Sequence, residues 1–136
     1  MLLISPLYLQ KAAQVYLPIC ALLAFSIEFL LKAWLIADGL SEDDVSKPHI
    51  RHDLEELLDL AKSRGLRNQH QNSAEIIAAM NAHHKKHEFR YLPAKGEFKL
   101  LNFPLAALVI EALDATVRLK TDAENVAAAV HRGEIR

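Results

Sequence analysis

A run of basic side chains holds most of the residues in this sequence that are suited to chemistry. The run and the residues that follow it are His83, His84, Lys85, Lys86, His87, Arg90 and Tyr91. Concentrated positive charge beside an aromatic ring suits phosphate groups, with stacking available for a base. An arginine can hold a phosphate through two hydrogen bonds, and a histidine can act as general acid or base near neutral pH. These residues are therefore the predicted nucleotide- or RNA-binding candidates.

The same residue types are sufficient for metal-independent cleavage of RNA. That reaction needs a base for the 2′-hydroxyl, an acid for the leaving oxygen and a cation for the developing charge. The alternative is a solvated helix end whose cations complement the helix dipole. A metal site is a third interpretation, because His83 and His87 are four residues apart and His84 is three from His87. The order differs from H-E-x-x-H and no third ligand has helical spacing, so we predict neither a metal nor a cofactor.

Glu28 and Lys32 form a second polar feature within a long apolar segment. They are four residues apart in the order that favours an ion pair on a helix. We expect the pair to lie inside a helical bundle or at its rim and to fix helix register. We also consider that Arg90, or a histidine of the basic run, reaches this polar spot and completes a site. The two interpretations are compatible.

The apolar segment itself, Leu17–Ala37, must be covered on every side. Either a bilayer or a helical bundle with a partner subunit would cover it. Glu28 and Lys32 would each cost about 2.5–3.5 kcal/mol near a bilayer centre, which favours the bundle. We therefore predict a homodimer through this first helix and no membrane insertion. The single cysteine, Cys20, and the lack of an evident secretory signal predict a cytoplasmic protein.

Hydrophobic periodicity and capping residues predict the elements that position these side chains. The first expected helix runs from about Leu7 to Asp38, with a kink or break at Pro18. The second runs from a cap at Asp53 to Gly65, and the third runs from a cap at Ser73 into the basic run. The fourth begins at Asn102 and Pro104 and reaches Lys120 or beyond, and a short fifth helix follows Thr121. A loop is expected over 40–48 and another over 89–102, where a short hairpin is an alternative. His49, Arg51 and His52 precede the second helix, where we expect them to end the loop while Asp53 caps the helix. His52 could still approach a site on a dimer partner.

These elements predict one all-α domain over residues 1–136, an antiparallel bundle of four or five helices. Residues 1–14 and 131–136 are expected to be terminal extensions. The chain has 16 Lys and Arg, 17 Asp and Glu and 7 His. This balance gives no general attraction to nucleic acid or membrane, so any attraction must come from local clusters.

Two segments and one short motif resemble the pattern of HEPN domains, which are small helical bundles of bacteria and archaea. The matching residues are Glu28, Leu31, Lys32 and Ala33, then His52, Asp53, Leu54, Leu57 and Ala61, and finally Phe89, Arg90 and Tyr91. The similarity covers roughly residues 15–120. It implies a bundle that pairs face to face with itself and functions in nucleotide or RNA chemistry. Some HEPN proteins are metal-independent endoribonucleases of toxin or defence systems, whereas others are partners of a nucleotidyltransferase antitoxin or lack catalysis.

The arginine-to-histidine motif of the nuclease group has only one match in this chain. Arg64 precedes His70 at the end of the second predicted helix, whereas the motif normally lies near the third and fourth helices. Arg90 has no histidine downstream before His131. The sequence therefore predicts a dimeric, HEPN-like protein that binds nucleotide or RNA at a basic cleft, with ribonuclease activity left open. The alternative is a non-catalytic helical dimerisation or adaptor module.

Overall fold

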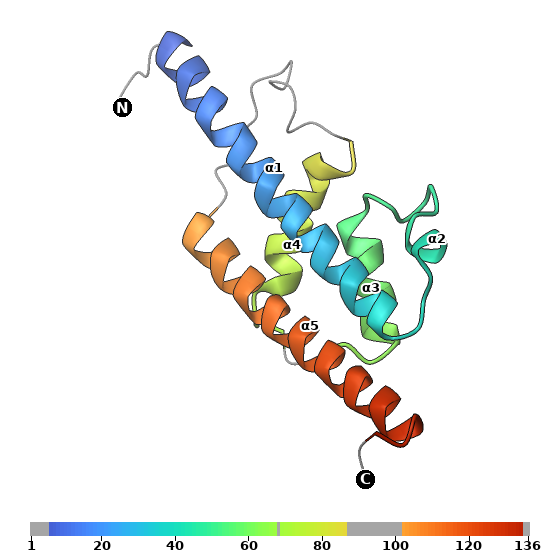
Figure 1. Cartoon of the computed structure of the whole chain (residues 1–136). Coiled ribbons are helices and arrows are strands. Elements are labelled where there is room, and N and C mark those ends of the chain that lie inside the picture. The colour runs from blue at the N-terminus through green and yellow to red at the C-terminus, as the bar shows by residue number, and fades with distance from the viewer. Residues whose placement is uncertain (1–5, 68, 87–101, 135–136) are drawn as a thin grey trace.

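Helices make up most of the chain in a computed structural model that describes residues 6–67, 69–86 and 102–134 (Figure 1). The helices are α1 (Pro6–Ala37), α2 (Glu42–Val45), α3 (Leu54–Ser63), α4 (Ser73–His84) and α5 (Phe103–His131). Within those ranges there is no strand, so the predicted all-α class is confirmed. The hairpin considered for the second loop lies outside the described residues.

The two longest helices, α1 and α5, lie side by side and run in the same direction (Figure 1). Tyr16 contacts Phe103 at the start of α5, with ring centroids 4.8 Å apart. At the other end of the contact, Lys120 forms an ion pair of 2.9 Å with Asp38, just after α1. The antiparallel packing predicted for the bundle therefore does not apply to this pair.

The shorter helices α3 and α4 do run antiparallel to one another. Asn81, near the end of α4, accepts a hydrogen bond of 2.8 Å from the backbone N–H of Leu54, which begins α3. Helix α3 itself is parallel to α1, because His52 before α3 contacts Glu28 and Arg64 after α3 contacts Asp38. The connection over residues 38–53 is long enough to carry the chain back from the end of α1 to its middle.

Local capping signals fix both ends of α3 as predicted. The side chain of Asp53 accepts a hydrogen bond from the backbone N–H of Glu56. After the helix, Gly65 adopts a φ of 109°, and the N–H of Leu66 returns to the carbonyl of Ala61 at 2.9 Å. This is a Schellman turn, in which glycine takes the left-handed position at no steric cost.

Two local predictions were wrong, and one of the two alternatives for Pro18 is excluded. The first loop contains α2, whose start is closed by a capping box between Ser41 and Asp44. Helix α1 is not divided at Pro18, which lies inside it. Helix α5 continues past Thr121 as one element, and an ion pair of 3.2 Å between Lys120 and Glu124 spans the predicted break. A continuous packed helix thus overrides a capping pattern that is only four residues long.

The core lies between one face of α1 and the other three long helices. Its largest fully buried apolar side chains include Ile27, Leu31, Leu35, Leu54, Leu57, Ile77, Met80 and Val109. Helix α1 is long and apolar enough over Gln14–Ala37 to cross a bilayer by length and composition alone, and 39% of its most apolar window is buried in this fold. Buried core helices of soluble proteins share that property, so the composition does not distinguish the two settings.

Candidate functional site

The most unusual polar residue in the fold is Glu28, a carboxylate on the buried face of α1. Its exposed fraction is 2%, so it is shielded from water almost completely. Burial of an ionised carboxylate is costly unless other groups replace the lost hydration. Glu28 must therefore be understood together with the side chains around it.

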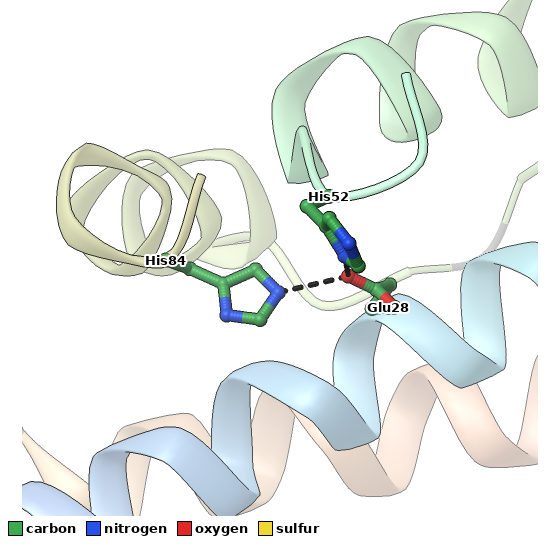
Figure 2. Close-up of side chains that lie close together, drawn as sticks. All are labelled: Glu28, His52 and His84. Carbon is green, nitrogen blue, oxygen red and sulfur yellow. Dashed lines mark hydrogen bonds and ion pairs between the residues drawn. The ribbon is translucent and has the colours of Figure 1, made fainter. Parts of the chain in front are cut away.

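Three basic side chains contact Glu28 and come from three places in the chain. His52 Nδ1 lies 3.0 Å and His84 Nε2 lies 2.9 Å from the same carboxylate oxygen, Oε1. Lys32 Nζ lies 3.2 Å from the other oxygen, Oε2. Figure 2 shows the two imidazoles converging on Glu28, one from the turn before α3 and one from α4. We call these four residues the Glu28 cluster.

The cluster stabilises the ionised form of Glu28. Burial alone would raise the pKa of this carboxyl, but the hydrogen bonds from His84 and His52 and the charge of Lys32 outweigh burial. Together they lower the pKa from 4.5 to about 2. Glu28 is therefore a carboxylate throughout the physiological range of pH.

An ionised carboxylate only accepts hydrogen bonds, and this fixes the orientation of both imidazoles. In their neutral forms, His52 must carry its proton on Nδ1 and His84 must carry its proton on Nε2. For His52, the basic nitrogen is then Nε2, on the opposite side of the ring from Glu28. A carboxylate that selects the tautomer and orientation of a histidine is the arrangement used to prepare a general base.

His84 is held more tightly than His52. Its side chain is 3% exposed, against 31% for His52. The ring of Phe25 meets the ring of His84 edge to face, with centroids 4.8 Å apart. His84 therefore orients Glu28 from inside the core, whereas His52 connects Glu28 to the surface.

His52 also lines a basic hollow of about 340 Å³. Its lining is Pro48, His49, Arg51, His52, Asp53, Lys85 and Lys86. The residues come from the turn before α3 and from the end of α4, which meet because these helices are antiparallel. Three of them carry permanent positive charge and two are histidines, so the hollow is suited to an anion.

The single carboxylate in this lining is already engaged in the fold. Asp53 caps α3 and also accepts a hydrogen bond of 2.8 Å from the side-chain amide of Asn81. Asn81 is fully buried, and it also donates to Glu55 and accepts from Leu54. The side chain of Asn81 thus fixes the turn that carries His52 against the end of α4.

The structure brings together some of the predicted site residues. Lys85 and Lys86 line the hollow, and Glu28 and Lys32 form the predicted ion pair. His84, from the basic run, reaches Glu28 as considered, but it is buried and does not line the hollow. The other predicted residues do not contribute to the described site: His83 is absent from the lining, and His87, Arg90 and Tyr91 lie outside the described residues.

His52 contacts Glu28 of its own chain, and the sequence analysis did not predict this contact. The approach of His52 to a site on a dimer partner, which the sequence analysis considered, stays a prediction. The role of Asn81 was missed entirely. The only available signal was a polar residue at a position facing α3, and such a signal does not identify its partners. A metal ion shared by His83 and His87 was one interpretation of the sequence but was not predicted, and His87 lies outside the described residues. Glu28, His52 and His84 do converge, with ligand atoms within 4.8 Å of one another.

Comparison with models of protein families, with curated proteins and with solved structures finds no match to this chain. The similarity to HEPN domains therefore stays a prediction from the residues quoted above. The geometry of the Glu28 cluster and of the basic hollow provides the remaining indication of function.

Proposed function

We propose that the protein binds a phosphate-bearing ligand, a nucleotide or RNA, in the basic hollow, and that His52 acts there as a general acid–base group. The observation that carries the proposal is that one imidazole belongs to both features. It is oriented by the buried Glu28 carboxylate, and it lines a hollow rich in positive charge. The predicted similarity to HEPN domains points to the same chemistry.

Cleavage of RNA is the enzymatic form of this proposal. Nε2 of His52 takes the proton of a 2′-hydroxyl, the freed oxygen attacks the adjacent phosphorus, and the bond to the 5′-oxygen breaks. The leaving oxygen takes a proton from an acid in the site, and the product carries a cyclic phosphate. Arg51, Lys85 and Lys86 would stabilise the charge that develops on the phosphate. No step requires a metal ion.

Cleavage of a labelled oligoribonucleotide in the presence of a chelator tests the catalytic part. We expect His52→Gln to lower kcat by roughly 10²–10⁴-fold, the usual contribution of a general base. His131→Gln, an exposed histidine at the end of α5, is the matched control and should leave the rate unchanged. Equal rates for wild type and His52→Gln, or no cleavage by the wild type on several RNAs, would contradict a catalytic role.

Fluorescence anisotropy with the same oligonucleotide tests binding separately. Each lost phosphate contact should reduce the slope of log K against log salt by about 0.7 for a single strand. We expect this reduction for Lys85→Ser and for Lys86→Ser, whereas Lys62→Ser on α3 serves as the control outside the hollow. Unchanged affinity in both hollow variants would exclude the basic hollow as the binding site.

A specific observation also favours the second candidate function, a helical dimerisation module. Helix α1 exposes five large apolar side chains on the side opposite the core: Val15, Ile19, Leu22, Phe29 and Ile36. Val15, Leu22, Phe29 and Ile36 follow one another at intervals of seven residues. Ile19 and the exposed Ala33 lie between them, four residues after Val15 and Phe29. We call this row the outer seam. A seven-residue apolar repeat is the spacing with which two helices pack along their length.

We infer that the outer seam pairs with the same seam of a second copy. The polar residue within it, Ser26, donates its hydroxyl to the carbonyl of Leu22 at 2.7 Å and would not hinder burial. Light scattering at micromolar concentration should give twice the chain mass for the wild type. Leu22→Glu should give a monomer with unchanged helix content, whereas Ala78→Glu on α4 should remain dimeric. A wild-type monomer would contradict the pairing without affecting the proposal for the hollow.

The resemblance to HEPN domains also suggests a partner protein and a cellular location. A nucleotidyltransferase-type antitoxin partner and a cytoplasmic location are both proposed on that basis, with Cys20 buried as a free thiol in agreement with a reducing compartment. Co-purification with the product of an adjacent gene tests the first, and fractionation of cells tests the second.

A further inference from the structure

The three residues that orient the proposed base also have the composition of a transition-metal site. His52 Nδ1, His84 Nε2 and Glu28 Oε1 lie within 4.8 Å of one another. Two imidazoles and one carboxylate are a common ligand set for Zn²⁺ and related ions. We propose that the Glu28 cluster binds one Zn²⁺-like ion through these three atoms.

The three ligand atoms are close together but must rearrange to close on an ion. Ligands of a tetrahedral zinc ion lie about 3.3 Å from one another, given metal–ligand bonds of about 2.0–2.1 Å. In the structure the two imidazole nitrogens are 3.0 and 2.9 Å from Oε1. Glu28 must therefore withdraw by a few tenths of an ångström from each ring, and the two imidazole nitrogens, which lie within 4.8 Å of one another, must come to about 3.3 Å in the bound state.

The contact with Lys32 and the types of the ligand atoms restrict how Glu28 can bind an ion and which ion the site favours. Lys32 holds Oε2 at 3.2 Å, so Glu28 would coordinate through Oε1 alone. Two of the three ligand atoms are nitrogens, whereas Mg²⁺ and Ca²⁺ require shells made largely of oxygen. The site therefore favours Zn²⁺, and the related Co²⁺ and Ni²⁺, over Mg²⁺.

Metal binding would also change what His52 presents to the hollow. With Nδ1 bound to the ion, the remaining proton of a neutral ring must lie on Nε2, which then donates hydrogen bonds. This nitrogen could no longer take a proton from a substrate. On the proposed function, occupancy by zinc and general-base action by His52 therefore exclude each other, and zinc would act as an inhibitor.

Calorimetric titration of the chelator-treated, full-length protein with zinc chloride tests the site directly. We expect one ion per chain and an increase in Tm, with no response to magnesium chloride. His52→Gln should weaken binding by at least about tenfold, since loss of even an outer partner of a metal ligand has effects of this size. His49→Gln and His83→Gln, histidines outside the trio, are the matched controls and should bind as the wild type does.

Spectroscopy of the wild type makes the test independent of how well the variants fold. Cobalt added to the wild type should give the visible absorption of a low-symmetry site with nitrogen and oxygen ligands. No zinc binding by the wild type, or equal binding by wild type and a folded His52→Gln, would overturn the proposal. These titrations contain neither RNA nor phosphate, so the two proposals are tested separately. Zinc binding can be absent while the hollow binds its ligand, and zinc can bind while the hollow does not.

Discussion

Two carboxylates, Glu28 in α1 and Asp38 just after it, each contact side chains from other parts of the fold. Their partners are of different kinds. Asp38, just after the helix, contacts Arg64, which follows α3, and Lys120 of α5. Glu28, ten residues earlier, contacts two histidines and a lysine. Both of these partners of Asp38 are permanently charged. Those of Glu28 outside its own helix are imidazoles, whose protons can be exchanged or replaced.

The two carboxylates also differ in how far they and their partners are exposed to solvent. The side chain of Asp38 is 17% exposed and its partners are more exposed still, whereas Glu28 and His84 are almost completely buried. At the Asp38 end, the ammonium of Lys120 also lies 5.1 Å from the centre of the Trp34 ring. Asp38 therefore forms a clamp between helices. Glu28 orients an imidazole beside a hollow, which is an arrangement suited to chemistry.

Removing the charge of Glu28 should have the largest effect on stability. Glu28→Gln keeps the shape of the side chain but leaves its basic partners without a buried counter-charge. Breaking a buried pair in this way typically costs about 3–5 kcal/mol. Urea denaturation of wild type and variant measures the difference in the free energy of unfolding. A loss below that found for Asp38→Asn would show that Glu28 is not the central tie of the fold.

The same comparison predicts a dependence on pH. Glu28 has a pKa of about 2 in the folded protein and 4.5 ordinarily. Between these values the unfolded chain binds a proton that the folded chain does not, so stability falls as pH falls from about 4.5 toward 2. A shift of this size corresponds to about 3 kcal/mol, all of it present above pH 4.5.

Unfolding experiments at several pH values, on wild type and Glu28→Gln, isolate this contribution. The difference in stability between the two proteins should be largest above pH 5 and should shrink steadily as pH is lowered. Other carboxyls with lowered pKa, such as Asp38 and Asp44, are present in both proteins and cancel in the difference. A difference that does not change with pH would contradict the pKa given for Glu28.

The sequence predicted the elements of this fold better than their arrangement. Capping residues and periodicity identified α3 almost to the residue, because Asp53 and Gly65 act within one turn of the helix. The parallel packing of α1 with α3 and α5 could not be predicted in the same way. It depends on how far the connections carry the chain, and one of those connections, over 38–53, contained an unexpected helix.

The candidate site was predicted in part for a similar reason. The pair of Glu28 and Lys32 lies within one helix, so its spacing reveals the contact. His52 and His84 are 24 and 56 residues from Glu28, and no local pattern reports contacts over such distances. The run of positive charge drew attention to the correct end of α4. It did not distinguish the buried His84 from the exposed lysines beside it.

Asp38→Asn should have the smallest effect and thereby complete the comparison. Ion pairs near the surface are typically worth about 0.2–1 kcal/mol each, because water and salt screen them. We therefore expect a loss of about 1 kcal/mol or less by urea denaturation, and a smaller loss when the measurement is repeated in concentrated salt. Lys120→Met should show the same salt dependence, since it removes the opposite side of the same contact. A loss from Asp38→Asn that matches Glu28→Gln and persists in salt would mean that permanent and titratable partners are equivalent in this fold. Glu28 would then contribute no more to the stability of the fold than Asp38 does.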